Sequence, residues 1–583
     1  MDGNTLLQTA LAHLQTGQFA QAEILYQTYL RVDPKNAEVF YNHGLALQRQ
    51  GKLEPAIISY RHALELKPGL IAALQNMGEA FHVQGNLETA EKCYLQVLSL
   101  HPDHVEVLNN LGIVLKEQGR LDEAILHYQR SLQLAPGYFK AYNNLGNVYK
   151  EIGLLDQAVT AYQKALELNP DHVETLSNYL FVLSIHPKCS PSQYLENARH
   201  YTSIVSAQAT PYLQWPALSN KELPIRIGVV SGDLRTHPVG FFVESIIEHL
   251  NAGMIALVAY STKPQEDALT ARIKPYFAAW HSLVGMSDQT AAHKIHNDGI
   301  QILIDLAGHT AHNRLPIFAW KPAPVQISWL GYFASTGLAE MDYVLADPVS
   351  VPQSQQQYFT ETICYLPDTR LCFTAPTAPE VAPLPALRNG YITFGCFQNL
   401  SKLDDAVLTV WARILQGLPN ARLRLQSHQL KANAIRKLML ERLQQHGITA
   451  ERVILAEPGS RESYLSAHAE VDVILDTFPY PGGTTTCEAL WMSVPTVTLA
   501  GETLLSRQGA SILTCAGLSD WVAKDEQDYV DTAINKSNDL PALTALRGSL
   551  RHQAQASPLF NAPRFARNLE LTLSSIWDKR TTE

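Results

Sequence analysis

The first third of the chain repeats one pattern of apolar and polar positions at a constant interval. Prolines stand at positions 34, 68, 102, 136 and 170. Four further columns keep the same step: Gly17, Gly51, Gly85, Gly119 and Gly153; Ala22, Ala56, Ala90, Ala124 and Ala158; Tyr26, Tyr60, Tyr94, Tyr128 and Tyr162; Gly44, Gly78, Gly112 and Gly146. Glycine permits a turn between two helices, and proline stops the second helix. The pattern predicts an array of helix pairs over residues 1–187.

An asparagine column follows the same step but has no evident packing role. Its members are Asn42, Asn76, Asn110, Asn144 and Asn178, all in the first helix of a unit. Buried amides commonly satisfy local or inter-repeat hydrogen bonds, which is the simpler interpretation. The interpretation we favour is a ladder of amides along a groove, where they would bind the backbone of an extended peptide.

Beyond the repeats, residues 188–223 indicate a docking helix and a connector. The pattern then changes to short β-branched runs separated by amphipathic stretches, which is typical of βαβ units. The expected strands are 225–230, 255–260, 302–305, 325–329 and 343–346, then 392–396, 422–426, 453–456, 473–476 and 496–499. We therefore expect Rossmann-like domains over residues 224–375 and 391–555, a connector over 376–390 and a helix over 556–583. The predicted fold class is α plus α/β.

Composition and charge reduce the range of expected partners and cellular locations. The formal net charge is -10 at pH 7, and no run of Lys or Arg occurs, so nucleic acid is not an expected partner. No segment approaches the roughly 18 consecutive apolar residues of a membrane span, and we expect a cytoplasmic protein without a membrane partner. Seven scattered cysteines without a Cys-x-x-Cys pair indicate reduced thiols rather than a disulfide framework or a zinc site.

The clearest candidate site follows the expected strand that ends at Asp476. Gly482 and Gly483 remove side-chain bulk, and Thr484 and Thr485 open a helix, so backbone N–H groups and hydroxyls converge on one point. This arrangement predicts a phosphate cradle. Glu488, one turn into the helix, could accept hydrogen bonds from a ribose. The alternative is a capped turn without a ligand.

Three further candidates follow other strand ends. Asn399 and Lys402 come after the strand 392–396, where an ammonium would stabilise a leaving diphosphate; the alternative is a solvated lysine. Asp233 and His237 come after the strand 225–230, and His237 could be a general base. His309 follows the strand 302–305 and is a candidate for contact with a sugar or an acceptor.

No metal site or common nucleotide motif is expected. His309 and His312 lack a third ligand at helical spacing. The sequence also lacks the Gly-rich loops of ATPases and dehydrogenases and the nucleophile elbow of hydrolases. The expected reaction therefore needs no metal or other cofactor.

These segments together carry a resemblance. The repeated unit resembles the tetratricopeptide repeat. The whole chain is similar to bacterial members of the O-linked N-acetylglucosamine transferase and SPINDLY family, through the segments 233–239, 308–314, 321–332, 399–402 and 482–490. The resemblance implies a tetratricopeptide-repeat superhelix followed by a GT-B glycosyltransferase. It also implies an inverting enzyme that moves N-acetylglucosamine from UDP-GlcNAc to Ser or Thr hydroxyls of proteins bound along the repeats.

The resemblance also implies roles for single residues. Lys402, Thr484 and Thr485 would bind the diphosphate, Glu488 would hold the ribose, and Tyr464 would stack on the base. His237 would lie near the acceptor and the sugar. Gln326 and Arg507 match segments of the family's cleft. Some features are closer to SPINDLY-type sequences, which use GDP-fucose, so protein O-fucosylation is an alternative activity. A repeat scaffold with a vestigial nucleotide-sugar site is an alternative from another class.

Overall fold

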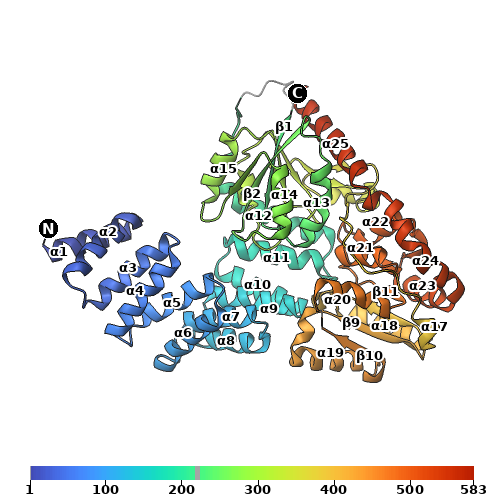
Figure 1. Cartoon of the computed structure of the whole chain (residues 1–583), viewed down its shortest axis with the longest axis horizontal. Coiled ribbons are helices and arrows are strands. Elements are labelled where there is room, and N and C mark those ends of the chain that lie inside the picture. The colour runs from blue at the N-terminus through green and yellow to red at the C-terminus, as the bar shows by residue number, and fades with distance from the viewer. Residues whose placement is uncertain (1, 217–223, 458, 583) are drawn as a thin grey trace. The chain divides into compact units, whose positions relative to one another are not determined.

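The structure is a computed structural model, and it describes residues 2–216, 224–457 and 459–582. The chain forms two compact units (Figure 1). The first comprises residues 1–149 and 160–170, and the second comprises residues 150–159 and 171–583.

The first unit consists of paired antiparallel helices. Their bounds are α1 Gly3–Gln15, α2 Phe19–Val32, α3 Ala37–Arg49, α4 Leu53–Leu66, α5 Ile71–Val83, α6 Leu87–Leu100, α7 Val105–Glu117, α8 Leu121–Leu134, α9 Phe139–Glu151 and α10 Leu155–Leu168. The last two helices extend into residues of the second unit. The turn glycines have positive φ, from 76° at Gly17 to 80° at Gly153, a conformation that glycine adopts without strain.

The tyrosine and second glycine columns pack against each other within the four helix pairs from α3–α4 to α9–α10. A Cβ placed on Gly44 would lie 2.6 Å from the Tyr60 ring, and one on Gly112 would lie 2.6 Å from the Tyr128 ring. Tyr60 and Tyr128 are fully buried. The glycine column therefore provides the space that the large aromatic ring fills.

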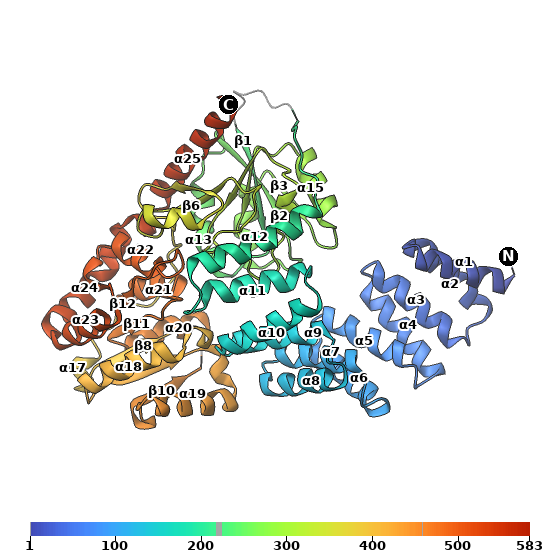
Figure 2. The ribbon, with the colours of Figure 1, turned by 180° about the vertical axis from the view of Figure 1, so that it is seen from behind.

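The second unit contains two parallel sheets (Figures 1 and 2). The first sheet has the order β3-β2-β1-β4-β5-β6-β7, with β1 Ile225–Ser231, β2 Ile255–Ser261, β3 Ala279–Ser282, β4 Ile302–Asp305, β5 Val325–Ser328, β6 Tyr343–Ala346 and β7 Thr362–Tyr365. The second sheet has the order β10-β9-β8-β11-β12-β13, with β8 Thr393–Cys396, β9 Arg422–Gln426, β10 Val453–Ala456, β11 Val473–Leu475, β12 Thr496–Leu499 and β13 Val522–Ala523. We call the domains built on these sheets the first lobe and the second lobe.

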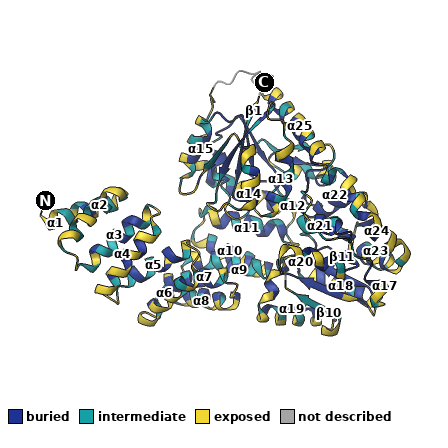
Figure 3. Cartoon of the chain, viewed as in Figure 1, coloured by how far each residue is buried: buried dark blue, intermediate teal, exposed yellow. Residues whose placement is uncertain are grey.

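Helices cover both sheets, and the strands are darker in Figure 3 because they are mostly buried. The helices are α11 Val173–Ile185, α12 Pro191–Ala207, α13 Pro238–His249, α14 Ala268–Ile273, α15 Asp288–Asn297, α16 Pro316–Ala319, α17 Ala386–Asn389, α18 Asp405–Gly417, α19 Asn433–Gln445, α20 Arg461–Ser466, α21 Thr484–Trp491, α22 Gln508–Cys515, α23 Glu526–Asn538, α24 Leu540–Ala556 and α25 Ala562–Thr582. The C-terminal helix α25 returns to the first lobe, where the Phe565 and Trp329 rings stack at 6.1 Å.

The helix α12 contacts the first lobe. The Tyr194 hydroxyl donates to the Ser335 carbonyl at 2.7 Å and lies 2.8 Å from the Tyr332 hydroxyl. The last residues of the expected connector, 217–223, lie outside the described residues.

The predicted fold class is confirmed: helical repeats precede two parallel α/β domains. Each of the ten expected strands is present with its bounds shifted by at most one residue. The sequence pattern did not predict β3, β7 and β13. All seven cysteines are free, and none of the helices described is long and apolar enough to cross a membrane.

Candidate functional site

Four loops that carry candidate residues emerge beside the central strands of the two sheets. In the first sheet, β1 and β4 are neighbours and the chain order reverses between them; in the second sheet, β8 and β11 have the same relation. Ligands of open parallel sheets bind at the carboxyl ends of the strands at such a switch point. The loops after β1, β4 and β8 carry His237, His309 and Lys402, respectively, and the loop after β11 leads to Thr484, the first residue of α21.

These loops line one cavity of about 550 Å³. Lining residues from the first lobe include Asp233, Arg235, His237, Lys263, His309 and His312. Those from the second lobe include Asn399, Lys402, Tyr480, Gly483, Thr484 and Thr485. Lys150, Asn178 and Phe181 line it as well. The volume suits a ligand of nucleotide-sugar size.

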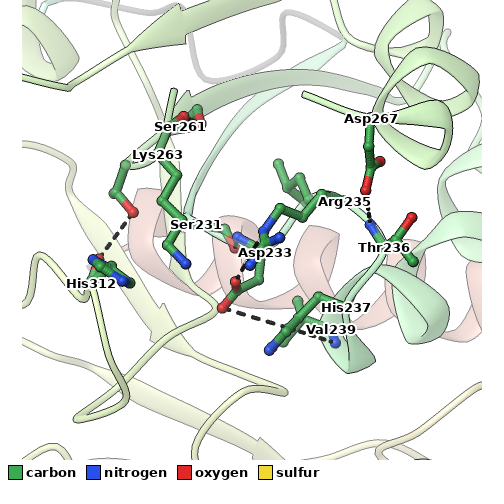
Figure 4. Close-up of polar contacts among 12 residues, drawn as sticks. Ser231, Asp233, Arg235, Thr236, His237, Val239, Ser261, Lys263, Asp267 and His312 are labelled. Carbon is green, nitrogen blue, oxygen red and sulfur yellow. Dashed lines mark hydrogen bonds and ion pairs between the residues drawn. The ribbon is translucent and has the colours of Figure 1, made fainter. Parts of the chain in front are cut away.

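His237 is the N-cap residue of helix α13 and lies beside a carboxylate (Figure 4). Its Nδ1 is 3.4 Å from the Val239 backbone nitrogen and 3.6 Å from Asp233 Oδ2. Burial lowers the pKa of His237, and the Asp233 charge opposes this shift. The ring is therefore neutral at pH 7 and able to accept a proton.

The two neighbours of Nδ1 favour different tautomers. If Nδ1 accepts from Val239 N–H, the proton resides on Nε2; if Nδ1 carries the proton, it can donate to Asp233 and leaves Nε2 free as a base. The second state has the arrangement of base and orienting carboxylate that general-base catalysis uses.

The loop before His237 is held in place from two sides. The backbone N–H of Thr236 donates to Asp267 Oδ2 at 2.7 Å, and Asp267 also caps helix α14. Gly240 meets the loop from the other side, because a Cβ there would lie 2.0 Å from the Arg235 carbonyl oxygen. Only glycine allows this close backbone contact.

The glycines and threonines before α21 form a tight cradle. A Cβ on Gly482 would lie within 2.5 Å of the Thr485 and Thr486 hydroxyl oxygens. Neither hydroxyl has a hydrogen-bond partner among the described residues, although both oxygens are buried. Two unpartnered hydroxyls at a helix N-terminus are groups that a phosphate oxygen would satisfy.

Lys402 is half-buried and its ammonium contacts this cradle. Its Nζ donates to the Pro481 carbonyl at 3.0 Å and to Gln398 Oε1 at 3.2 Å, and lies 3.7 Å from the Tyr480 ring centroid. Burial lowers the pKa of Lys402 to about 8, and the charge of Asp476 opposes this shift. The ammonium stays charged near pH 7 and can pair with an anion.

Asp476 ties the cradle to the sheet. Its Oδ1 accepts from the Gly482 N–H at 2.7 Å and from Gln398 Nε2 at 3.2 Å, and its Oδ2 accepts from the Thr498 hydroxyl at 2.9 Å. Asn399 lines the cavity, and its side chain accepts from the Ser401 N–H at 2.9 Å. Each of these bonds fixes the loop that carries Lys402 or Thr484.

Glu488 and Tyr464 form a separate cluster near the start of α21. The Tyr464 hydroxyl donates to Glu488 Oε2 at 2.8 Å, and Arg461 forms an ion pair with Oε1. The Arg461 guanidinium also lies 5.0 Å from the Phe241 ring centroid, in the first lobe. Neither Tyr464 nor Glu488 is among the residues that line the cavity.

Two further predicted residues point elsewhere. Gln326 in β5 is fully buried, and its amide donates to the Phe318 and Glu340 carbonyls, both at 2.9 Å. Arg507 donates to the Val349 carbonyl at 2.7 Å. Both residues bond to backbone groups and do not line the cavity, so the structure does not bring them together with His237 and Lys402.

His309 lines the cavity, but both of its ring nitrogens are already in hydrogen-bond contact with other residues. Nδ1 lies 3.0 Å from the Ser177 hydroxyl, and Nε2 lies 3.0 Å from the Thr336 carbonyl oxygen. Burial lowers its pKa to about 4. Within the described ranges, no group of three or more His, Cys, Asp or Glu side chains is placed to hold a metal ion.

The asparagine column is half-buried throughout. Asn144 Nδ2 donates to Asn109 Oδ1 at 2.9 Å, and Asn76 Nδ2 lies 3.4 Å from the Tyr41 hydroxyl. These bonds agree with the simpler interpretation, inter-repeat hydrogen bonding. Asn178, however, lines the cavity, as a peptide-binding amide would.

Sequence reasoning missed several residues of the cavity wall. Lys263 closely follows β2, so the same attention to strand ends could have found it. Lys150 and Phe181 lie on helices of the repeat pattern, where no sequence signal distinguishes them from ordinary helix positions.

Comparisons with known proteins agree with this geometry. In a structural comparison, an O-GlcNAc transferase variant of Thermobaculum terrenum matches with a TM-score of 0.83 and 34% identity, over 88% of this chain and 98% of that chain. The SPINDLY protein of Arabidopsis thaliana, named a probable UDP-N-acetylglucosamine–peptide N-acetylglucosaminyltransferase, is 40% identical over 374 residues. The SEC protein of the same plant, of the same named activity, is 28% identical over 408 residues.

The fold and the cavity define a glycosyltransferase of the GT-B type. The pattern of glycosyl transferase family 41 matches residues 199–374 and 384–569, and the chain belongs to this family. Tetratricopeptide repeat patterns match residues 7–71, 70–137 and 139–172. The predicted family and the predicted enzyme class are thereby confirmed. The alignments cover 63% of this chain but only 41% of SPINDLY, and 67% of this chain but only 42% of SEC.

Proposed function

We propose that the protein is an inverting protein O-glycosyltransferase that moves N-acetylglucosamine from UDP-GlcNAc to Ser or Thr hydroxyls. The observation that carries this proposal is the single cavity that Lys402 and the Thr484–Thr485 helix start share with His237. One side offers groups for a diphosphate, and the other offers a neutral base. The named activities of the SPINDLY, SEC and Thermobaculum terrenum proteins support the same donor and reaction.

The reaction requires two changes of charge. The acceptor hydroxyl loses a proton as its oxygen attacks the anomeric carbon, and His237 takes that proton. The bond from the anomeric carbon to the diphosphate breaks, and the diphosphate gains negative charge. Lys402 and the N–H groups of α21 stabilise this charge more strongly in the transition state than in the ground state.

The nucleoside would bind at the cluster of Tyr464, Glu488 and Arg461. A carboxylate has about four lone-pair sites, so Glu488 retains acceptors for a ribose hydroxyl beside its bond from Tyr464. Protein acceptors would bind along the asparagine column, and Asn178 would contact them at the cavity. The reaction would take place in the cytoplasm and would need no metal or other cofactor.

GDP-fucose is a second candidate donor. The Arg461 guanidinium lies 5.6 Å from the Tyr464 ring centroid, at the proposed nucleoside site. A guanidinium pairs with the O6 and N7 acceptors of guanine, which uracil lacks. This observation favours a guanine nucleotide and keeps protein O-fucosylation as the alternative activity.

Calorimetric titration separates these possibilities. UDP, UDP-GlcNAc, GDP and GDP-fucose are each titrated into the full chain, and the proposal expects binding of the two uridine nucleotides. Preferential binding of the guanine nucleotides would identify GDP-fucose as the donor in place of UDP-GlcNAc. Binding of none of the four would support a repeat scaffold without catalysis.

Transfer assays test the mechanism. With the donor that binds, His237→Ala should reduce kcat by about 10²–10⁴-fold and Lys402→Ala by about 10²–10³-fold. The exposed His552→Ala and Lys524→Ala serve as matched controls and should retain wild-type rates. Unchanged transfer by both His237→Ala and Lys402→Ala would show that the mechanism is wrong.

A further inference from the structure

The first-lobe wall of the cavity has more positive than negative charge. Asp233, Arg235 and Lys263 lie together at the ends of β1 and β2 (Figure 4). Asp233 is one carboxylate between two cations. The nearby His237 and His312 rings are neutral at pH 7, since burial lowers both pKa values. One positive charge on this wall is therefore not balanced within the cluster.

The two cations also have unused hydrogen-bond donors. Arg235 Nε is buried, and no residue that the structure describes accepts a hydrogen bond from it; Asp233 Oδ1 forms an ion pair with it at 3.8 Å, beyond hydrogen-bond distance. Among the described residues, the Lys263 Nζ has neither a hydrogen-bond nor an ion-pair partner. Buried donors normally have acceptors, so Arg235 Nε, together with the half-buried Lys263 ammonium on the same cavity wall, points to an anionic ligand.

Local packing holds the Lys263 side chain toward this site. A Cβ on Gly232 would lie 3.3 Å from Lys263 Cγ, so the lysine stem rests on the loop that carries Asp233 and Arg235. Figure 4 shows the side chain extending from the end of β2 toward Asp233. Burial and the Arg235 charge lower the pKa of Lys263. A bound anion would reduce this repulsion between the two cations.

We propose that Lys263 and Arg235 bind a carboxylate of the acceptor, so that the enzyme prefers Ser or Thr residues flanked by Asp or Glu. This inference rests on the proposed function. The diphosphate of the donor is the other possible anion, but Lys402 and the start of α21 already serve it from the second lobe. Lys263 and Arg235 instead share the first-lobe wall with His237, the base that takes the proton of the acceptor hydroxyl.

The test compares three synthetic peptide libraries that differ only beside a single Ser. The flanking positions carry Asp, Asn or Lys, and kcat/KM is measured for each library with the donor that binds in the titration. A charge-assisted hydrogen bond at a partly exposed site should favour the Asp over the Asn library by about tenfold. Lys263→Met should bring this ratio close to one, whereas the exposed Lys524→Met should keep it.

A charge-reversal variant distinguishes loss of the proposed contact from misfolding of the protein. Lys263→Glu should shift the preference from the Asp library to the Lys library, a gain that a damaged protein cannot show. The donor KM of each variant is measured in parallel. A raised donor KM with an unchanged Asp-to-Asn ratio would assign the anion to the diphosphate and overturn the inference.

The remaining outcomes separate the two proposals. Equal transfer to the Asp and Asn libraries by the wild type overturns the inference and leaves the proposed function standing. Absence of transfer to every library with either donor overturns the proposed function, and the inference with it.

Discussion

Gly240 offers a sharp test of how the fold positions His237. Gly240→Ala adds one methyl group in helix α13, where the Arg235 carbonyl oxygen would be 2.0 Å from the new Cβ. Ordinary van der Waals contact begins near 3.4 Å, so the loop and the helix must move apart. The contact is with backbone, and rotation of a side chain cannot relieve it.

The expected loss follows from that displacement. Overpacking of this kind costs about 1–3 kcal/mol of stability, and a misplacement of about 1 Å at a reacting group can cost about 10²-fold in rate. The gap between 2.0 Å and 3.4 Å requires a shift at least that large. We therefore expect Gly240→Ala to lower kcat/KM for transfer by about a hundredfold. Nucleotide affinity should change little, because Lys402 and Thr484 belong to the second lobe.

Gly548→Ala is the matched control. Gly548 also lies within a helix, α24, but its Cβ would meet nothing within 4 Å. Alanine should stabilise this helix by about 0.5–1 kcal/mol. The unfolding temperature and kcat/KM for transfer are measured for both variants. If Gly240→Ala keeps wild-type kcat/KM and unfolds at the same temperature as Gly548→Ala, the close backbone contact does not position the His237 loop.

Two further predictions concern the cradle and the repeats. Because burial lowers the pKa of Lys402 to about 8, its ammonium loses its proton between pH 7 and pH 9, and calorimetry should show nucleotide affinity falling by about tenfold. Lys402→Arg, which stays charged, should show a flat profile, and equal binding by the wild type at both pH values would contradict the prediction. Gly44→Ala places a Cβ 2.6 Å from the Tyr60 ring and should destabilise the repeats by about 1–3 kcal/mol, seen by circular dichroism as earlier loss of helix. Gly69→Ala, with open space around its Cβ, is the control, and identical melting of the two variants would refute the packing argument.

The sequence predicted the strands best where a run of apolar residues is followed directly by a polar loop. Apolar β-branched runs located the ten expected strands, and the polar loops after β1, β4, β8 and β11 all reach one cavity because parallel strands end at the same edge. The missed strands β3, β7 and β13 all lie at the edge of a sheet. Trp280 and His281 in β3 are only half-buried, and β13 has two residues, so neither strand produces a continuous apolar run.

Side-chain direction was harder to predict. Gln326 lies in a strand that the pattern located, but the pattern does not tell which groups its amide meets in the core. The sequence analysis did not single out Lys263, because its neighbours in the fold, Asp233 and Arg235, follow a different strand and are distant in sequence. The ion pair of Glu488 with Arg461 likewise depends on how two elements pack, which no spacing along the chain records.

The contact between each glycine and its tyrosine has a consequence for how this array can change length. Gly44 meets Tyr60, and Gly112 meets Tyr128, so each contact joins the two helices of one repeat unit. Duplication or deletion of a whole unit carries both partners together and leaves every other pair intact. A gain or loss of part of a unit separates a ring from its glycine, so the array can evolve in steps of one whole unit without redesign of its core.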